Sequence, residues 1–498
     1  MDTVEEATIA ELQAAMTAGS VTSRGLVQVY LGRIEAIDRA GPKLNSVLEI
    51  NPDALEIAEA LDRERQEKGV RGPLHGIPIL IKDNIDTADR MHTTAGSLAL
   101  MDAKPLQDAT VARKLREAGA VILGKTNLSE WANFRSTHSS SGWSGRGGQC
   151  RNAYAQDRTP GGSSSGSGVA IAANLAAASI GTETNGSIMS PASQASLVGI
   201  KPTVGLVSRA GIIPISHSQD TAGPMTRSVA DAAILLGAIA GVDPRDPATA
   251  GAGGHTEDFT QFLDPDGLRG ARIGVARKTY FGYSEKTDAV AEQALTTLSR
   301  LGAEVIDPAD IPTAEAFRDA PTTDVLLWEF KADINAYLAG LGPNAPMRTL
   351  QDLIAFNNRH ADRELPYFGQ ELFERSQAKT DLSDPEYLEA LEKIQRLARE
   401  QGIDAVMDQH QLDAIVAPTN APAWMIDLID GDHRIGGSST PAAVSGYPSI
   451  TVPAGYTHGL PIGLSFIGRR FSDSLLIKLA YAFEQGMRAR VAPVFAPS

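Results

Sequence analysis

GGSSSGSGVAIAANLAAASIGTETNGSIMSPA, the stretch from Gly161 to Ala192, places serines on two glycine-rich turns separated by a run of small apolar residues. Glycine permits positive φ and lets the backbone approach another group closely, as a chain must when its own N–H groups line a pocket. Between the turns, the run Val169–Ala178 is apolar on all sides except at Asn174, which predicts a short buried helix. Two flexible turns held against one tightly packed element are a layout suited to catalysis.

The second turn, Gly181-Thr-Glu-Thr-Asn-Gly-Ser187, ends on a serine that is a candidate nucleophile. The residues leading to its hydroxyl supply four successive backbone N–H groups, those of Thr184, Asn185, Gly186 and Ser187. Amides in such a row stabilise the oxyanion of a tetrahedral intermediate, usually the largest contribution to catalysis of acyl transfer. The turn therefore predicts an oxyanion hole.

A serine hydroxyl is a weak nucleophile and needs a base, for which the sequence offers two candidates. His217 stands three residues before Asp220, as in a serine-hydrolase dyad, although such groups are recognised by geometry and not by proximity in sequence. Lys82 follows the apolar, strand-like segment Ile77–Ile81, and burial at the end of a strand lowers the pKa of a lysine. The alternative for Lys82 is an ordinary surface lysine paired with Asp83, the commoner arrangement in an arbitrary sequence.

Taken together, these pieces resemble the amidase signature family of serine hydrolases. The second turn matches the family's Gly-[Ser/Thr]-[Asp/Glu]-x-x-Gly-Ser motif, and Gly161–Gly166 matches its Gly-Gly-Ser-Ser-[Gly/Ser]-Gly run. The spacing from Ser163 to Ser187 and the Gly-Ile-Pro before Lys82 also fit. The similarity covers most of the chain and is densest between residues 72 and 231, returning between residues 413 and 469.

The resemblance implies a Ser–Ser–Lys triad. In the family, a neutral lysine, here Lys82, takes a proton from a bridging serine, here Ser163, which takes one from the nucleophile, here Ser187. The bridging serine follows a cis peptide bond. Ser164 is expected to hydrogen-bond the lysine or the second turn.

Two residues of the second turn add to this expectation. Close members of the family often carry Asp or Gly where this chain has Asn185, so we expect the triad to persist while pH dependence or substrate preference shifts. Glu183 occupies the family's acidic position. We expect it to orient the turn by accepting backbone N–H groups, with proton transfer as the lesser alternative.

Substrate contacts are predicted from the segment Asn127–Thr137, which resembles the family segment beside the acyl pocket. Trp131 and Thr137 are therefore candidates for lining that pocket, and a core position for Trp131 is equally compatible with the sequence. Aromatic residues farther along the chain predict either an apolar lid over the cleft or plain core. They are Trp328, Phe330, Tyr337, Phe356, Tyr367 and Phe368.

Composition narrows the class of protein. The net charge of −15 argues against a nucleic-acid partner, and no apolar run reaches the roughly 18–20 residues of a membrane span. The single cysteine, Cys150, permits no internal disulfide, and no Cys/His cluster has metal-ligand spacing. We therefore expect no metal and no cofactor. The acidic N-terminus lacks the features of a signal peptide, so we expect a cytoplasmic protein. We also expect a monomer or a homodimer.

The alternation of strand-like and helical segments predicts an α/β fold. We expect a large mixed, mostly parallel central sheet covered by helices on both faces, which is the amidase signature fold, with an inserted, mainly helical cap segment. We expect one domain over residues 1–498, with N-terminal helices (1–40), a signature core (72–235), a second α/β segment with the helical cap (265–410) and a C-terminal return to the core sheet (411–498). The cap is predicted to include helices at 324–341 and 385–410.

The predicted activity is hydrolysis of the C–N bond of a small amide through an acyl-enzyme on Ser187. Within the family the chain looks most like the peptide amidase and aryl acylamidase branch, which implies primary, C-terminal peptide or aryl amides, with carbamates as further substrates, as for a urethanase. The alternative is the amidotransferase subunit that hydrolyses glutamine and passes ammonia to a partner. A nucleotide-binding protein is a third interpretation, but neither glycine turn is followed by the Lys-[Ser/Thr] of a P-loop.

Overall fold

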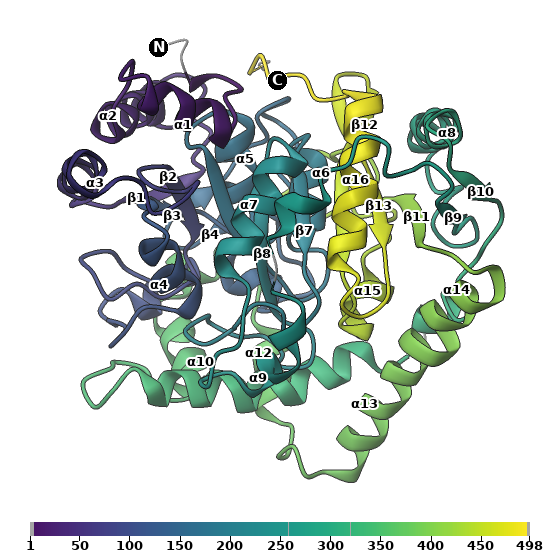
Figure 1. The fold of residues 1–498 in the computed structure, drawn as a ribbon. Helices are drawn as coiled ribbons and strands as arrows, with labels where there is room; N and C mark the ends of the chain where they lie inside the picture. The colour runs from purple at the N-terminus through teal and green to yellow at the C-terminus, as the bar shows by residue number, and fades with distance from the viewer. Residues whose placement is uncertain (1–3, 257, 319, 496–498) are drawn as a thin grey trace.

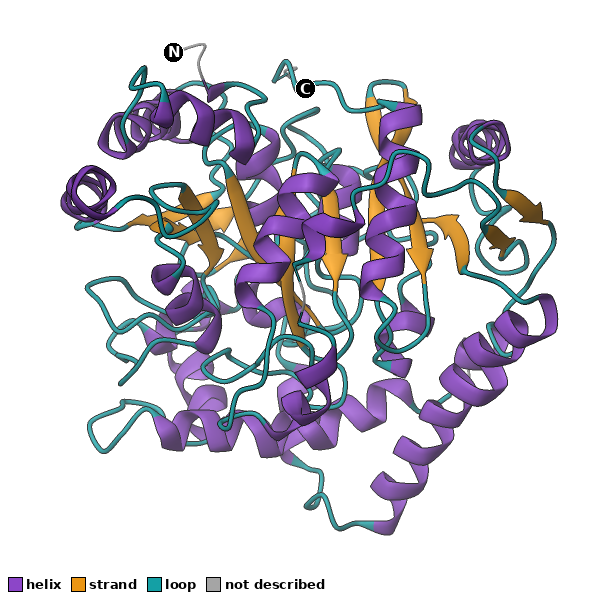
Figure 2. Cartoon of the chain, viewed as in Figure 1, coloured by secondary structure: helices purple, strands orange, loops and turns teal. Residues whose placement is uncertain are grey.

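The computed structural model describes residues 4–256, 258–318 and 320–495, and its centre is one large sheet (Figures 1 and 2). Its strands are β1 (Val47–Ile50), β2 (Pro78–Lys82), β3 (Val121–Thr126), β6 (Ala178–Glu183), β7 (Val198–Lys201), β8 (Thr221–Thr226), β9 (Arg272–Val275), β10 (Glu304–Ile306), β11 (Ala414–Pro418), β12 (Ser449–Thr457) and β13 (Leu460–Ile467). A separate hairpin pairs β4 (Trp143–Ser144) with β5 (Gly148–Gln149).

In the described part of the chain the sheet has 11 strands in the order β1-β3-β2-β6-β8-β7-β12-β13-β11-β9-β10. β2 runs parallel to β3 and β6, and β9 runs parallel to β10 and β11, whereas the other six neighbouring pairs are antiparallel. The predicted α/β class with a large mixed sheet is confirmed. The expectation that the sheet is mostly parallel overstates the parallel pairing, because short connections such as the one between β12 and β13 make antiparallel pairs.

Helices cover both faces of the sheet. Within the described residues they are α1 (Ile9–Thr17), α2 (Ser23–Arg33), α3 (Ala54–Lys68), α4 (Thr110–Glu117), α5 (Ser165–Ala172), α6 (Met189–Gln194), α7 (Val229–Ile239), α8 (Glu285–Arg300), α9 (Thr322–Gly340), α10 (Leu350–Arg359), α11 (Ala361–Glu364), α12 (Glu371–Gln377), α13 (Pro385–Ala398), α14 (Asp404–His410), α15 (Thr440–Ser445) and α16 (Asp473–Met487). α4, α7, α16 and α8 pack along one face, and α5 and α6 pack against the other (Figure 1).

The small-residue run between the two serine turns folds differently from the prediction. The helix α5 begins at Ser165 and ends at Ala172, and Ala178 is the first residue of β6. Residues 169–178 are all buried, including Asn174 at 2% exposure, so the apolar pattern carried no periodicity that separates a helix from a buried strand. The chain leaves the helix through Asn174 at φ +57°, a left-handed conformation that asparagine tolerates.

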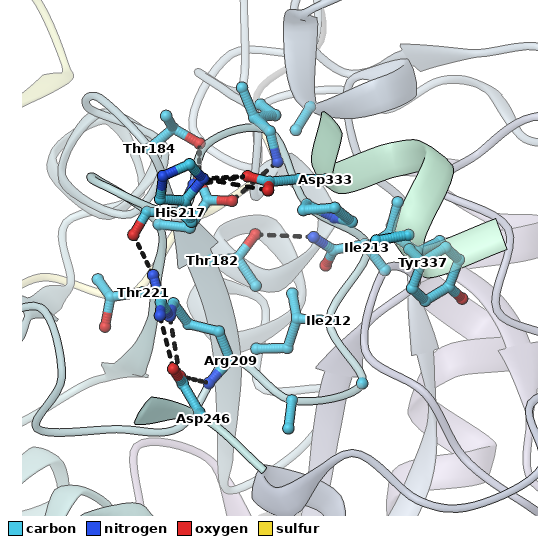
Figure 3. Close-up of a pocket in the computed structure, with 18 of the residues that line it drawn as sticks. Thr182, Thr184, Arg209, Ile212, Ile213, His217, Thr221, Asp246, Asp333 and Tyr337 are labelled. Carbon is cyan, nitrogen blue, oxygen red and sulfur yellow. Dashed lines mark hydrogen bonds and ion pairs between the residues drawn. The ribbon is translucent and has the colours of Figure 1, made fainter. Parts of the chain in front are cut away.

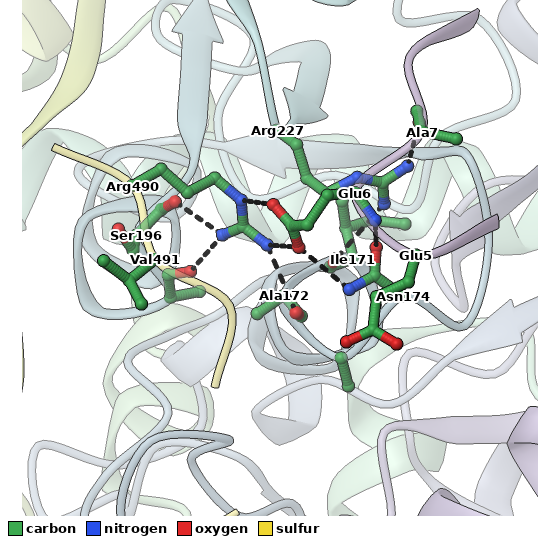
Figure 4. Close-up of polar contacts among 12 residues, drawn as sticks. Glu5, Glu6, Ala7, Ile171, Ala172, Asn174, Ser196, Arg227, Arg490 and Val491 are labelled. Carbon is green, nitrogen blue, oxygen red and sulfur yellow. Dashed lines mark hydrogen bonds and ion pairs between the residues drawn. The ribbon is translucent and has the colours of Figure 1, made fainter. Parts of the chain in front are cut away.

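Asn174 also joins the two ends of the chain (Figure 4). Its amide exchanges hydrogen bonds of 2.9 Å with Glu6, whose carboxylate pairs with Arg490 at 2.7 Å. Arg490 in turn donates to the carbonyl oxygen of Ser196. The one polar residue in the apolar run therefore binds Glu6 directly, and Glu6 links it to Arg490 near the other end of the chain.

The helices from α9 to α14 form a cap that runs beneath the sheet in Figure 1. A hydrophobic cluster joins the cap to the core, with Phe330 of α9 stacked against Phe373 of α12 and tilted against Phe134 of the core. The predicted helix over 385–410 is divided by a π-helical turn at Arg399–Ile403 into α13 and α14. One residue of the cap, Leu326 of α9, lines the cavity that contains Ser187.

Candidate active site

Two adjacent parallel strands bring together the residues around Lys82. Lys82 is the last residue of β2, has no exposed surface, and lies beside β6, which carries Thr182. Its Nζ lies 2.8 Å from Ser163 Oγ, 2.9 Å from Thr182 Oγ1 and 3.3 Å from the Thr182 carbonyl oxygen. Asn84 Nδ2 donates to the same Thr182 hydroxyl at 3.0 Å. Lys82 is therefore a buried amine held against a serine hydroxyl and is not a surface lysine.

The surroundings of Lys82 favour the neutral amine. Burial lowers its pKa from 10.5 to about 7, and the nearby carboxylates of Asp220 and Glu183 oppose that shift without cancelling it. A group whose pKa lies near neutral pH can both accept and return a proton during turnover. Lys82 thus has the environment of a general base.

The first glycine turn presents Ser163. The peptide bond between Gly162 and Ser163 is cis, as the family resemblance implied, and Gly161 adopts a φ of +70°. Ser164 donates to the Thr182 carbonyl oxygen at 3.0 Å and accepts from the Thr182 N–H at 3.2 Å, so it bonds the strand that leads into the second turn. The Ser164 N–H also donates to the Ser187 carbonyl oxygen at 3.1 Å. These bonds hold the two serine turns side by side.

Glu183 organises the second turn. Its two carboxylate oxygens accept the backbone N–H groups of Gly186 at 2.7 Å, Ile188 at 2.8 Å and Met189 at 3.0 Å, which is the orienting role that the sequence suggested. Because the Gly186 N–H points to Glu183, it is not available to an oxyanion, contrary to the prediction. In the part of the chain that the structure describes, the N–H groups of Thr184, Asn185 and Ser187 donate to no protein acceptor.

The side chain of Asn185 points to a different element. Its Oδ1 accepts from Ser439 Oγ at 2.7 Å, and its Nδ2 donates to Thr440 Oγ1 at 3.4 Å, where α15 begins. The neutral amide therefore ties the turn to the C-terminal part of the chain. The left-handed φ of +83° at Gly186 lets the backbone reverse after it.

Ser187 is 7% exposed and opens onto a cavity of about 280 Å³. The residues that line the cavity include the apolar side chains of Phe134, Ile215 and Leu326, the last from the cap helix α9. Its charged lining residues are Asp432 and Arg434. In the described residues no hydrogen bond joins the Ser163 and Ser187 hydroxyls, so the relay between them is not formed as it is between Lys82 and Ser163.

A second cavity, of about 400 Å³, shares the lining residues Ala132, Thr184 and Ile215 with the first (Figure 3). It contains the alternative base, His217, whose Nδ1 lies 2.9 Å from an oxygen of Asp333. Asp220 instead accepts from the Thr184 hydroxyl and from the N–H groups of Ile215 and Ser216. No His217–Asp220 dyad is formed, and His217 does not line the cavity that contains Ser187.

The predicted substrate contacts Trp131 and Thr137 do not line either cavity. Trp131 is 2% exposed and packs edge-on against Phe373, so it is a core residue. Thr137 is exposed, and both its N–H and its hydroxyl donate to Glu371. The segment does reach the Ser187 cavity, but through the three residues that follow Trp131.

Of the six aromatic residues predicted as lid or core, three are buried (Trp328, Phe330 and Phe368), Tyr337 and Phe356 are half-buried, and Tyr367 is exposed. Trp328 and Phe330 are 2% and 0% exposed. Among the six, Tyr337 lines the second cavity, where its hydroxyl donates to Asp86 at 2.8 Å. Phe368 lies over the guanidinium of buried Arg135. Core packing therefore accounts for three of the six aromatic residues.

Several residues of the site carried no sequence motif that singled them out. Asn84 follows Lys82 by two positions, and Asp220 is distinguished in the sequence only by its spacing from His217. Asp432 and Arg434 come from a loop more than two hundred residues after Ser187 in the chain, and nothing local to that loop links it to the serine turns. Their positions follow only from the pairing of the β11 and β12 region with the core sheet.

Among the residues that the structure describes, no helix is long and apolar enough to cross a membrane. Over the same residues, no group of three or more His, Cys, Asp or Glu side chains is placed to hold a metal ion. Cys150 is buried, and burial raises the pKa of its thiol.

Comparisons with known proteins agree with the fold and the motifs. A family model described as Amidase matches residues 25–477. A probable amidase of Arabidopsis thaliana is 45% identical over 99% of this chain and 92% of its own length. The solved peptide amidase of Stenotrophomonas maltophilia is 55% identical, covers 98% of this chain and 99% of its own, and superposes with a TM-score of 0.94.

A more distant relative is a glutamyl-tRNA(Gln) amidotransferase subunit of Chloroflexus aurantiacus, which is 35% identical over 97% of both chains. The family match spans most of the sequence, and the structural match extends over nearly all of it. The chain belongs to the amidase signature family and is a hydrolase that acts on amides.

Proposed function

We propose that the protein hydrolyses amides through a covalent acyl-enzyme on Ser187, with Lys82 as base and Ser163 as the bridge between them. The observation that supports this most is the 2.8 Å contact between Lys82 Nζ and Ser163 Oγ in a site where burial lowers the lysine pKa to about 7. The backbone bond from Ser164 to Ser187 keeps the second serine next to the first.

In acylation, neutral Lys82 takes the Ser163 proton while Ser163 takes the proton of Ser187. Ser187 Oγ forms a bond to the amide carbon, and the carbonyl oxygen becomes an oxyanion stabilised by the N–H groups of Thr184, Asn185 and Ser187. The C–N bond then breaks as the departing nitrogen takes a proton from Ser163. Lys82 then returns its proton to Ser163. The amine leaves with one added proton, which balances the proton that Ser187 gave up.

In deacylation, water occupies the place that the amine has left. Ser163 and Lys82 take a proton from it, its oxygen bonds to the acyl carbon, and the ester bond to Ser187 breaks as Ser187 regains its proton. The products are the carboxylic acid and the free enzyme. The same two hydroxyls and one amine therefore serve both halves of the reaction.

We propose that the substrates are C-terminal amides of peptides, with aryl amides and carbamates as further candidates. The 55% identity to a solved peptide amidase supports this over the amidotransferase activity, since the amidotransferase subunit of Chloroflexus aurantiacus is only 35% identical. Turnover of a simple amide by this chain alone favours our proposal, whereas ammonia release that needs added partner chains favours the alternative.

The test is mass spectrometry of the enzyme mixed with a panel of amides and carbamates. We expect an acyl adduct on Ser187 that is absent in Ser187→Ala and strongly reduced in Lys82→Ala. Lys201 offers a matched control, because it is also a fully buried lysine and contacts only the Pro202 carbonyl oxygen by hydrogen bond in the described structure. Hydrolysis undiminished in Lys82→Ala would place the base elsewhere, and His217 would be examined next.

A further inference from the structure

The cap helix α9 carries a fully buried carboxylate outside both cavities. Glu329 has no exposed surface and lines neither of them. Its Oε2 accepts from the Ser218 hydroxyl at 2.9 Å, from the Ser218 N–H at 3.2 Å and from the Ser216 hydroxyl. Its Oε1 accepts from the Tyr387 hydroxyl at 2.9 Å and lies 3.5 Å from His217 Nε2. Because most of these bonds come from one short segment, the carboxylate fixes where that segment lies.

The same segment continues to the second turn. Asp220 accepts from the N–H groups of Ile215 and Ser216 at 2.8 and 2.9 Å, which closes residues 215–220 into a compact turn. Its other oxygen accepts from the Thr184 hydroxyl at 2.5 Å. Thr184 is also one of the three residues of the second turn whose N–H groups donate to no acceptor in the described part of the chain. The turn at residues 215–220 is therefore bonded to α9 at one end and to an oxyanion donor residue at the other.

The spacing of residues along α9 places Glu329 between two groups that reach the cavities. Leu326 lines the cavity that contains Ser187. Asp333 lines the second cavity, where one of its oxygens accepts the His217 N–H at 2.8 Å (Figure 3). Positions 326, 329 and 333 fall on one face of a helix, because they are three and four residues apart. Since a helix moves as a unit, a shift of α9 that changes the Ser187 cavity also moves the carboxylate that holds the turn.

We propose that Glu329 is a positioning residue that couples the seating of α9 to the N–H group of Thr184 through the turn at residues 215–220. Glu329 touches no substrate and moves no proton. It holds the turn and, through Asp220, keeps the Thr184 backbone in the orientation that the oxyanion needs. A carboxylate suits this role, because both of its oxygens accept hydrogen bonds, whereas an amide of the same shape has only one accepting atom. The inference rests on the proposed function, since it takes the Thr184 N–H as an oxyanion donor.

The first test is Glu329→Gln, which keeps the shape of the side chain and replaces one accepting oxygen with an NH₂ group. We expect kcat for N-acetylphenylalaninamide to fall about tenfold while KM changes less than about twofold. The oxyanion exists only after the substrate has been attacked, so its stabilisation contributes to kcat and not to substrate binding. Rates are measured at about pH 9, about two units above the pKa of Lys82, so that a shift in that pKa does not contribute.

A double-mutant cycle with Thr184→Val shows whether the effect passes through the turn. This substitution removes the hydroxyl that bonds to Asp220 and keeps the Thr184 N–H group. If Glu329 acts through Asp220, one break already uncouples the contacts, and both substitutions together lower kcat only as much as the more severe one alone. Independent effects would multiply, to about a hundredfold for two tenfold losses, and that result would overturn the inference.

Ser218→Ala is a milder break in the same contacts and decides the question if Glu329→Gln fails to fold. It removes one hydroxyl donor and leaves the carboxylate bonded to the Ser216 and Tyr387 hydroxyls. We expect kcat to fall about threefold with KM unchanged, and no further loss when Ser218→Ala is added to Thr184→Val. A native kcat in Ser218→Ala, or a fall that multiplies with that of Thr184→Val, contradicts the proposed coupling.

Glu371 of α12 provides the matched control, because it is another carboxylate of the cap that holds a core segment. It accepts from the Ser136 and Thr137 hydroxyls, both at 2.9 Å, and from the Thr137 N–H at 2.5 Å, and it lines neither cavity. Glu371→Gln should leave kcat and KM unchanged. An equal fall of kcat in Glu371→Gln would show that the cap only has to be anchored, which overturns a specific role for Glu329.

Acylation of Ser187 is followed in parallel by mass spectrometry of samples quenched at successive times. If the native enzyme forms no adduct, the proposed function is wrong. If the native enzyme forms the adduct and Glu329→Gln forms it at the native rate, this inference alone is wrong.

Discussion

The pH dependence of kcat/KM is the sharpest consequence of the buried amine. With the pKa of Lys82 lowered to about 7, the neutral, active form is about one tenth of the enzyme at pH 6 and about nine tenths at pH 8. Activity should therefore rise about tenfold over that interval and level off above it. An unperturbed lysine, with its pKa of 10.5, would instead give a rate that keeps rising about tenfold per pH unit up to about pH 10.

Asp220 allows the assignment of that pH profile to Lys82. Its carboxylate raises the lysine pKa, so Asp220→Asn should move the rising limb to lower pH while the amide still accepts from the Thr184 hydroxyl. The assay is initial-rate hydrolysis of a small amide in a constant-ionic-strength buffer series, with Lys201→Met as the control whose limb should not move. A midpoint near 10, or a limb unmoved by Asp220→Asn, would refute the reasoning. Asp220 itself titrates near 6, because burial raises its pKa, so the comparison is read above about pH 6.5.

Three further predictions follow from named contacts. Glu183→Gln replaces a carboxylate oxygen that accepts a backbone N–H with an amide NH₂ that cannot accept one. In steady-state kinetics kcat should therefore fall about tenfold or more, with a smaller change in KM. An unchanged kcat would contradict the orienting role of Glu183. Asn185→Asp adds a negative charge beside Ser187 and should shift the rising limb of the pH profile to higher pH, and a profile identical to that of the native enzyme would remove the basis for this expectation. Trp131→Ala should lower the free energy of unfolding by about 3–5 kcal/mol in denaturant titrations, because a core aromatic ring is lost, and a loss below about 1 kcal/mol would show that the ring is not packed as described.

The sequence was informative where function depends on local backbone geometry. The motifs around Ser163 and Ser187 and the strand ending in Lys82 are short and continuous, and the structure brings Lys82 against Ser163. The sequence was silent where the site depends on contacts between distant segments. Arg434 lies in a loop without a distinctive motif, and it reaches the cavity because the chain returns to the sheet through β11 and β12. Asn133 lies within Asn127–Thr137, the segment predicted to lie beside the acyl pocket, but it was not among the residues predicted to line that pocket.

The predictions that differ from the structure also failed for physical reasons. Gly186 appeared to be an oxyanion donor because the sequence shows that a residue has an N–H but not which acceptor it faces, and Glu183 takes it. The helix placed at 169–178 was shifted because residues buried on every side have no amphipathic period. Trp131 belongs to the core for a similar reason, since a large aromatic residue near a pocket and one beneath it have the same sequence signature.

The linkage from Asn174 through Glu6 to Arg490 has a consequence for biosynthesis. Glu6 and Arg490 are 484 positions apart in the chain, and their ion pair lies at the end of the helix that starts beside the bridging serine. The hydrogen bond from Arg490 to the carbonyl oxygen of Ser196 cannot form on the ribosome until Arg490 has emerged. The finished arrangement therefore requires synthesis to have passed Arg490, and a product truncated before Arg490 lacks these contacts.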